Sequence, residues 1–265
     1  MRLFNRFINP TVSNAPSVKR LPTYLAVTFA SVGLLTLSAC NHDDDNDNNV
    51  TTDNNVTTQA TYQVAVQNIT NGQPLTPLGV VLHEPGYSAW ELGESVSTGL
   101  ENLAESGDPS SFLAEADAVS TVAMSASSSN GPFGPGNTET VTLTVDSSAS
   151  LHLTVAAMLA NTNDAFTGVK NWSIGDLAVG DSATTMTYVF DAGTEANDET
   201  ADTMPGPAAS AGAAEGFNAD RSADLDRLTI HRGAITVDDG LTTSVLTEGH
   251  RWLNYAARIV VTRTQ

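Results

Sequence analysis

The chain has 265 residues, of which 40% are hydrophobic and 15% are charged, and its formal net charge is −19. This acidic balance argues against a nucleic-acid partner, because phosphate recognition needs clustered Lys and Arg. It also argues against docking on anionic lipid through a basic face. A single cysteine rules out an internal disulfide framework.

The first forty residues have the pattern of a secretion signal. Basic residues precede an apolar run over residues 21–37, which closes on Leu37-Ser38-Ala39-Cys40. This pattern predicts a signal peptide over residues 1–39 rather than a spanning helix. The last four residues resemble the lipobox of bacterial lipoproteins, so we expect Cys40 to be lipidated and to anchor the mature chain in a membrane. The alternative is a plain signal peptide that is cleaved elsewhere.

The residue after the cysteine, Asn41, resembles the pattern of lipoproteins that are sent to the outer membrane. We therefore expect an outer-membrane lipoprotein of the cell envelope, facing either the periplasm or the outside. Residues 41–60 are almost wholly Asn, Asp and Thr. Because such a segment has too little apolar surface to offset the entropy of ordering, residues 40–60 are predicted to be a lipidated cysteine and a disordered tether.

The remaining residues, 61–265, are enough for one all-β domain. Removing the signal takes away four basic residues and no acidic ones, so the mature chain has 7 basic and 30 acidic residues and a net charge of −23. About 205 residues lie beyond the tether, a length that supports one sizeable core.

Alternating or continuous apolar runs predict the strands of this domain. They cover residues 62–69, 80–83, 119–127, 139–145, 151–159, 184–190, 228–237 and 251–264. Between residues 87 and 118, apolar side chains from Trp90 to Ala116 recur at helical spacings, which predicts a short helical insertion. Residues 194–226 are predicted to be a long excursion. These spacings favour an antiparallel two-sheet β-sandwich.

Two acidic motifs follow strand-like segments. Asn-Thr-Asn-Asp occupies residues 161–164, and Asp-Ala-Gly-Thr-Glu occupies residues 191–195. If residues 169–177 run back across the molecule, both motifs reach the same edge. Carboxylate and carbonyl oxygens gathered there form a hard oxygen site of the kind that Ca²⁺ prefers. The alternative is ordinary turn chemistry, in which Asp and Asn bond the local backbone.

Five stretches of this domain occur in the order found in the spondin N-terminal domain. They are residues 66–75, 100–108, 158–168, 191–195 and 252–259. The chain resembles this family, and the resemblance implies a β-sandwich similar to calcium-dependent phospholipid-binding modules, with one bound calcium.

The resemblance also implies the calcium ligands, which are Asp164, Asp191 and Glu195. Glu195 stands where animal members often have Asp, which lengthens the side chain by one methylene and keeps the charge. The cysteines and the thrombospondin-type repeats of animal members are absent here, so their adhesive or neural roles are not transferred.

The sequence leaves three functions open. The first is a non-enzymatic, calcium-binding, membrane-anchored module that binds a glycan, matrix or envelope protein partner. The second is a hydrolase that uses His231 or His250 with a nearby carboxylate. The candidate carboxylates are Asp226, Asp238, Asp239 and Glu248. The chain has no Gly-x-Ser-x-Gly elbow and no His-Glu-x-x-His motif, which argues against catalysis. The third is a structural envelope spacer.

Overall fold

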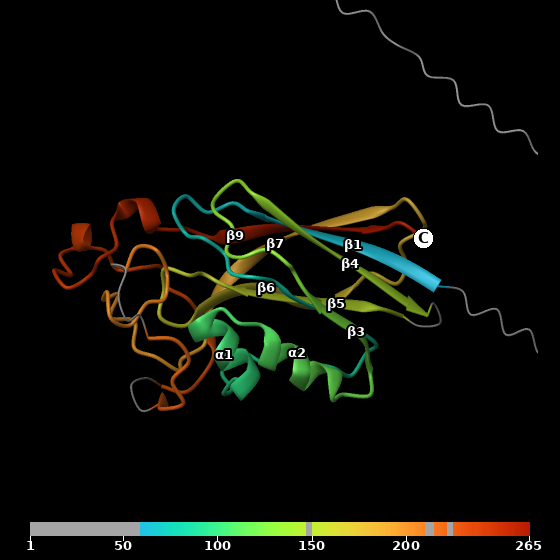
Figure 1. Ribbon diagram of the computed structural model, residues 1–265, viewed down its shortest axis with the longest axis horizontal. Coiled ribbons are helices and arrows are strands. Elements are labelled where there is room, and N and C mark those ends of the chain that lie inside the picture. Colours follow the sequence, from blue (N-terminus) through green and yellow to red (C-terminus); the bar gives the residue numbers. More distant parts are fainter. Residues whose placement is uncertain (1–58, 147–149, 210–214, 222–224) are drawn as a thin grey trace, which may run out of the picture. The chain divides into compact units, whose positions relative to one another are not determined.

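The computed structural model describes residues 59–146, 150–209, 215–221 and 225–265 (Figure 1). The predicted signal peptide, Cys40 and all but the last two residues of the predicted tether lie outside the described residues. Among the residues described, no helix is long and apolar enough to cross a membrane.

The described chain forms a mostly β fold with two α-helices and two short 3-10 helices. The elements are β1 (Gln59–Asn68), β2 (Gly79–His83), α1 (Thr98–Ser106), α2 (Ser110–Asp117), β3 (Val122–Ser127), β4 (Thr138–Asp146), β5 (His152–Met158), β6 (Ala165–Ser173), β7 (Ser182–Asp191), β8 (Thr229–Ile230), η2 (Val237–Asp239), η3 (Glu248–His250) and β9 (Tyr255–Arg263). The predicted antiparallel β class with a short helical insertion is confirmed.

The strands form one nearly closed antiparallel sheet. Their order is β3-β2-β5-β6-β7-β9-β1-β4, and β8 pairs with β7 off this path. β7 joins the two halves of the sheet, because it pairs with β9 along most of its length and with β6 through only three residue pairs. Figure 1 shows the half that contains β1, β4 and β9 lying above the half that contains β5 and β6.

β1 shows how the sequence pattern produces this sheet. Its buried side chains alternate with more exposed ones, so that Tyr62, Val64 and Val66 all face the interior. The strand begins at Gln59, two residues before the predicted domain start at residue 61. Ala60 is buried and lies opposite Val145 of β4, so these two residues belong to the sheet.

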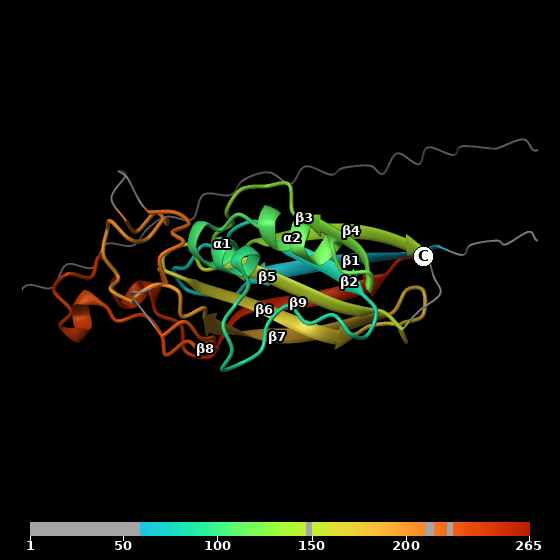
Figure 2. The same ribbon diagram turned by 90° about the horizontal axis from the view of Figure 1, so that it is seen from below.

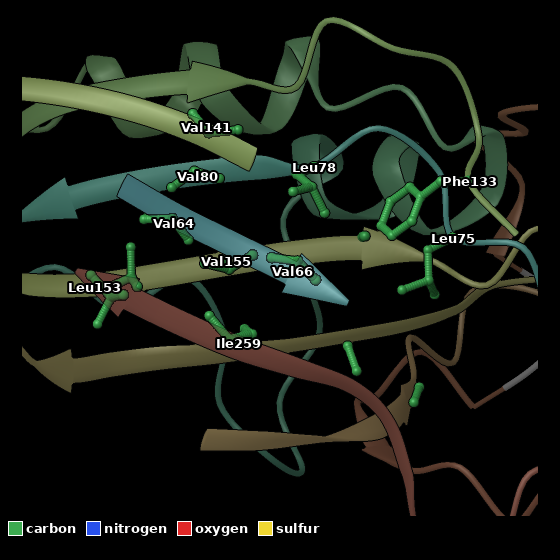
Figure 3. Packing of buried hydrophobic residues seen from close by; sticks show 14 of the residues in the cluster. Val64, Val66, Leu75, Leu78, Val80, Phe133, Val141, Leu153, Val155 and Ile259 are labelled. Carbon is green, nitrogen blue, oxygen red and sulfur yellow. The ribbon is translucent and has the colours of Figure 1, made fainter. Parts of the chain in front are cut away.

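The main core lies between the two halves of the sheet. Val64 of β1, Val141 of β4, Leu153 of β5 and Ile259 of β9 all point into it (Figure 3). Each of these side chains is at most 5% exposed. Burying such a side chain contributes roughly 1.5–3 kcal/mol, so this core is the main source of stability.

A second core lies between the helices and the outer face of β2, β5 and β6. Val81 of β2 points toward the helices, whereas its neighbours Val80 and Leu82 point into the main core. β2 is therefore buried on both faces, which explains its continuous apolar sequence. The side chain of Ser97 caps the start of α1 by accepting from the backbone N–H of Leu100.

Three predicted elements differ from the structure. The helical insertion starts at Thr98, because Trp90 lies in the loop before the helix and packs edge-on against Phe166. The return strand is Ala165–Ser173 and not residues 169–177. The predicted strand over residues 228–237 is wrong, since only Thr229–Ile230 pair with β7.

Two local features explain why the chain after β8 does not continue to pair as a strand. Gly233 has a φ of +98°, which lies outside strand geometry. The backbone N–H of Ile235 donates to the Glu199 side chain at 3.0 Å instead of to a neighbouring strand. The segment therefore becomes a loop that leads into η2.

Candidate metal centre

The start of β6 and the end of β7 lie side by side. Ala165 is opposite Asp191 in the antiparallel ladder, so the 161–164 loop adjoins the 191–195 loop at one end of the sheet. The sequence predicted that these two acidic motifs reach the same edge, and the strand pairing brings them there.

Asp164 anchors one loop to the other. Its Oδ2 accepts from the backbone N–H of Thr194 at 2.7 Å and of Glu195 at 3.1 Å, and from the Thr194 hydroxyl at 3.2 Å. Its Oδ1 is buried and has no hydrogen-bond partner among the described residues. Burial, reinforced by the charge of Asp191, raises the pKa of Asp164 to about 7.

Gly193 lets the second loop make this turn. Its φ is +72°, a region that side-chain-bearing residues rarely adopt. Its carbonyl oxygen accepts from the backbone N–H of Asp226 at 2.8 Å. A Cβ at this position would lie 2.3 Å from the carbonyl oxygen of Arg227, so the loop requires glycine.

Glu195 points a second unpartnered carboxylate oxygen into the protein. The residue is 8% exposed, and its Oε2 is buried without a hydrogen-bond partner in the described chain. Burial is the main reason why the pKa of Glu195 rises to about 9, and the charges of Glu105 and Asp164 add to the effect. A buried carboxylate without a partner is costly, so this position favours either a proton or a cation.

Glu105 of α1 belongs to the same acidic interior and was not foreseen from the sequence. It is 1% exposed, its Oε1 has no partner among the described residues, and its other oxygen accepts from the backbone N–H of Asn218 at 2.8 Å. Glu101, one helical turn earlier, instead pairs with Arg221. One sequence feature could have revealed Glu105: it stands four residues after Glu101, so the two glutamates share a helix face that is otherwise apolar.

Asp191 is half-buried and already has a donor on each oxygen. Oδ1 accepts from the backbone N–H of Gly193 at 2.9 Å, and Oδ2 accepts from the Asn197 amide at 2.8 Å. The carbonyl oxygen of that amide accepts from Nε2 of His231 at 3.2 Å. Nδ1 of His231 accepts from the backbone N–H of Gly233, so this imidazole is neutral, and burial lowers its pKa.

The three predicted ligands therefore differ in their surroundings. Asp164 and Glu195 adjoin and each has an unpartnered oxygen, whereas Asp191 is turned toward Asn197. In the described part of the chain, no three His, Cys, Asp or Glu side chains are arranged to hold a metal ion by themselves. An ion held here would need backbone carbonyls, water or a turn of the Asp191 side chain to complete its ligands.

The residues of the alternative hydrolase site are engaged elsewhere. Asp226 pairs with Arg221, and both Asp239 and Glu248 pair with Arg251. Asp238 accepts from the backbone N–H of Glu248, and His250 accepts from the backbone N–H of Thr247. Among the described residues, none of these four carboxylates is hydrogen-bonded to His231 or His250.

Comparison with family models assigns the chain to a known family. The family model of Spondin_N matches residues 70–208, which is more than half of the chain and includes both acidic loops. The chain belongs to the Spondin_N family. A search among curated proteins found no match.

Proposed function

We propose that this protein is a non-enzymatic, calcium-binding module of the cell envelope. It is anchored in the outer membrane through a lipidated Cys40 and binds a glycan, matrix or envelope protein partner. The observation that carries the proposal is the pair of buried carboxylate oxygens without hydrogen-bond partners, Oδ1 of Asp164 and Oε2 of Glu195.

A divalent cation would offset the cost of burying the charged carboxylates of Asp164 and Glu195 at this end of the sheet. At neutral pH the raised pKa values of Asp164 and Glu195 mean that charging these groups costs folding free energy. Calcium takes six to eight oxygen ligands in flexible geometry, and loop carbonyls and water supply those that carboxylates do not. Asp164, Glu195 and Asp191 would hold the ion, which would stiffen the two loops.

The finer architecture belongs to the same proposal. Because β6 and β7 pair through only three residue pairs, the two halves of the sheet are joined loosely along one side. We place them as the two layers of a β-sandwich that resembles calcium-dependent phospholipid-binding modules.

Calorimetric titration of chelator-treated protein with calcium tests the metal site. We expect one saturable site, with binding lost or strongly weakened in Asp191→Asn and in the isosteric Glu195→Gln. Asp176→Asn is the matched control, because Asp176 is exposed and follows the far end of β6. No saturable binding, or undiminished binding in either ligand variant, would mean that the site is misassigned.

A second experiment separates a binding module from a structural spacer. The purified mature protein is applied to a glycan array and used in a pull-down with envelope proteins, each with and without calcium. A calcium-dependent partner supports the binding module. Normal calcium binding with no partner in either assay favours the spacer, in which calcium only stabilises the loops.

A further inference from the structure

A cavity of about 700 Å³ lies beside the proposed metal centre and has no assigned role. It is built around β8 and the segment after it, together with residues from η2 and the 191–199 loop. Figure 2 shows β8 at the loop end of the sheet. Its volume falls within the range of pockets that take small organic ligands.

A large share of the few basic residues of the mature chain line this pocket. The mature chain has only 7 Lys and Arg, yet Arg227, Arg232 and Arg251 all line this one cavity. Arg251 is neutralised by Asp239 and Glu248. Arg227 and Arg232 are exposed, and neither has a carboxylate partner within the described ranges.

The acidic groups of the lining are already committed to protein donors. Asp191 accepts from Gly193 and Asn197, and Glu199 accepts from the backbone N–H of Ile235. Asp239 accepts from Arg251 and from Thr236. The cationic donors that remain for a ligand are the guanidinium groups of Arg227 and Arg232, and a guanidinium matches a carboxylate through paired N–H groups.

The rim of the pocket is apolar. Leu225 is 67% exposed, and Ile230 and Ile235 are each 48% exposed. The imidazole of His231, also in the lining, is neutral because its Nδ1 accepts from Gly233. A ligand that fills this space thus meets cationic donors at one place and aliphatic side chains at another.

We propose that this pocket binds a monoanionic organic carboxylate that carries an apolar portion. The carboxylate pairs with Arg227 and Arg232, and the apolar portion covers the exposed side chains of Ile230 and Ile235. A dianion such as phosphate is disfavoured, because Asp191, Glu199 and Asp239 add negative charge to the same lining.

Asp191 connects this pocket to the proposed metal centre, since it lines the pocket and is also a proposed calcium ligand. If calcium neutralises Asp191, the carboxylate binds more tightly, and by linkage calcium binds more tightly in its presence by the same factor. Only this coupling rests on the proposed function. Carboxylate binding itself is tested without calcium, so the two proposals fail separately.

The test is an NMR titration, in chelator, of ¹⁵N-labelled residues 41–265, which are expressed without the signal peptide and therefore carry no lipid. The probes are hexanoate, hexan-1-ol, acetate and inorganic phosphate. We expect saturable shifts with hexanoate, centred on the amides of Gly233 and Ile235, and weaker binding of the other three probes. Arg227→Ala and Arg232→Ala should each weaken hexanoate binding by about tenfold, as expected for a lost charge-assisted contact.

Arg258→Ala is the matched control, because Arg258 is an exposed arginine of β9 without a carboxylate partner in the described chain and lies outside the pocket. It should bind hexanoate like the unaltered protein. Equal binding of hexan-1-ol and hexanoate, tighter binding of phosphate, or an equal loss in Arg258→Ala would overturn the proposal. So would the absence of saturable shifts with every probe.

Discussion

Substituting Gly193 by alanine disrupts the proposed metal centre without removing any ligand. Gly193 sits between Asp191 and Glu195 with a φ of +72°, and its Cα faces the backbone of Arg227. A methyl group there would lie 2.3 Å from the Arg227 carbonyl oxygen, closer than a Cβ tolerates. The backbone of Arg227 cannot move aside as a flexible side chain can. Either the 191–195 loop or the segment at Arg227 must therefore shift.

The cost has two parts. A non-glycine residue in the left-handed region costs about 1 kcal/mol, and forcing extra volume against fixed backbone costs about 2 kcal/mol more. The free energy of unfolding should therefore fall by about 3 kcal/mol, which lowers the Tm of a domain of this size by about 9 °C.

Gly180→Ala separates the two parts. Gly180 has a φ of +93°, but a Cβ there meets nothing within 4 Å, so only the backbone strain applies. That variant should lose about 1 kcal/mol, or about 3 °C in Tm. The measurements are thermal and urea unfolding in chelator, followed by calcium titration. Equal losses in the two variants would refute the reasoning, since the contact with Arg227 would then carry no cost.

The remaining predictions concern one buried acid and the N-terminal segment. Burial raises the pKa of Glu199 from 4.5 to about 7, so the folded state binds this proton more tightly than the unfolded state, and stability falls as pH rises through that window. Glu199→Gln removes this titration. Between about pH 4.5 and about pH 7.5, the free energy of unfolding measured in urea should therefore fall less in the variant than in the unaltered protein, by up to about 3 kcal/mol. An equal fall in both proteins would contradict this prediction. Cys40→Ser should yield a protein that is unprocessed or no longer partitions with membranes, and unchanged processing and partitioning would argue against lipidation. A chain that starts at Thr57 retains all of β1 and should unfold at nearly the temperature of the mature chain. The residues before Thr57 have too little apolar surface to add to the core. A large fall in the Tm of the truncated chain would show that those residues pack on the domain.

The sequence by itself determined the elements whose side-chain pattern is local. The alternation in residues 62–69 already specifies which side chains of β1 face the core, because a strand repeats every two residues. The same local signal placed the acidic motifs after strand-like segments. Asp164 and Asp191 could therefore be assigned to strand ends, whereas their meeting at one edge depended on the return strand, which the structure shows to be Ala165–Ser173.

Other assignments depended on contacts between distant segments. Residues 228–237 have an apolar sequence typical of a strand, yet Glu199 binds the backbone N–H of Ile235 and ends the pairing after Ile230. The start of the helical insertion shifted for a similar reason, because Trp90 packs on Phe166 of β6.

Only the tertiary structure decided which carboxylates are buried without hydrogen-bond partners, and only the tertiary structure formed the pocket lined by Arg227 and Arg232. Glu105 meets the charge of Glu195 because α1 packs across β5 and β6, and that contact joins residues ninety positions apart. Arg227 and Arg232 face a cavity with Asp191 for the same kind of reason. Burial and nearby charge determine whether an oxygen is left without a partner, and both are set by the packing of distant segments, which periodicity along the chain does not encode.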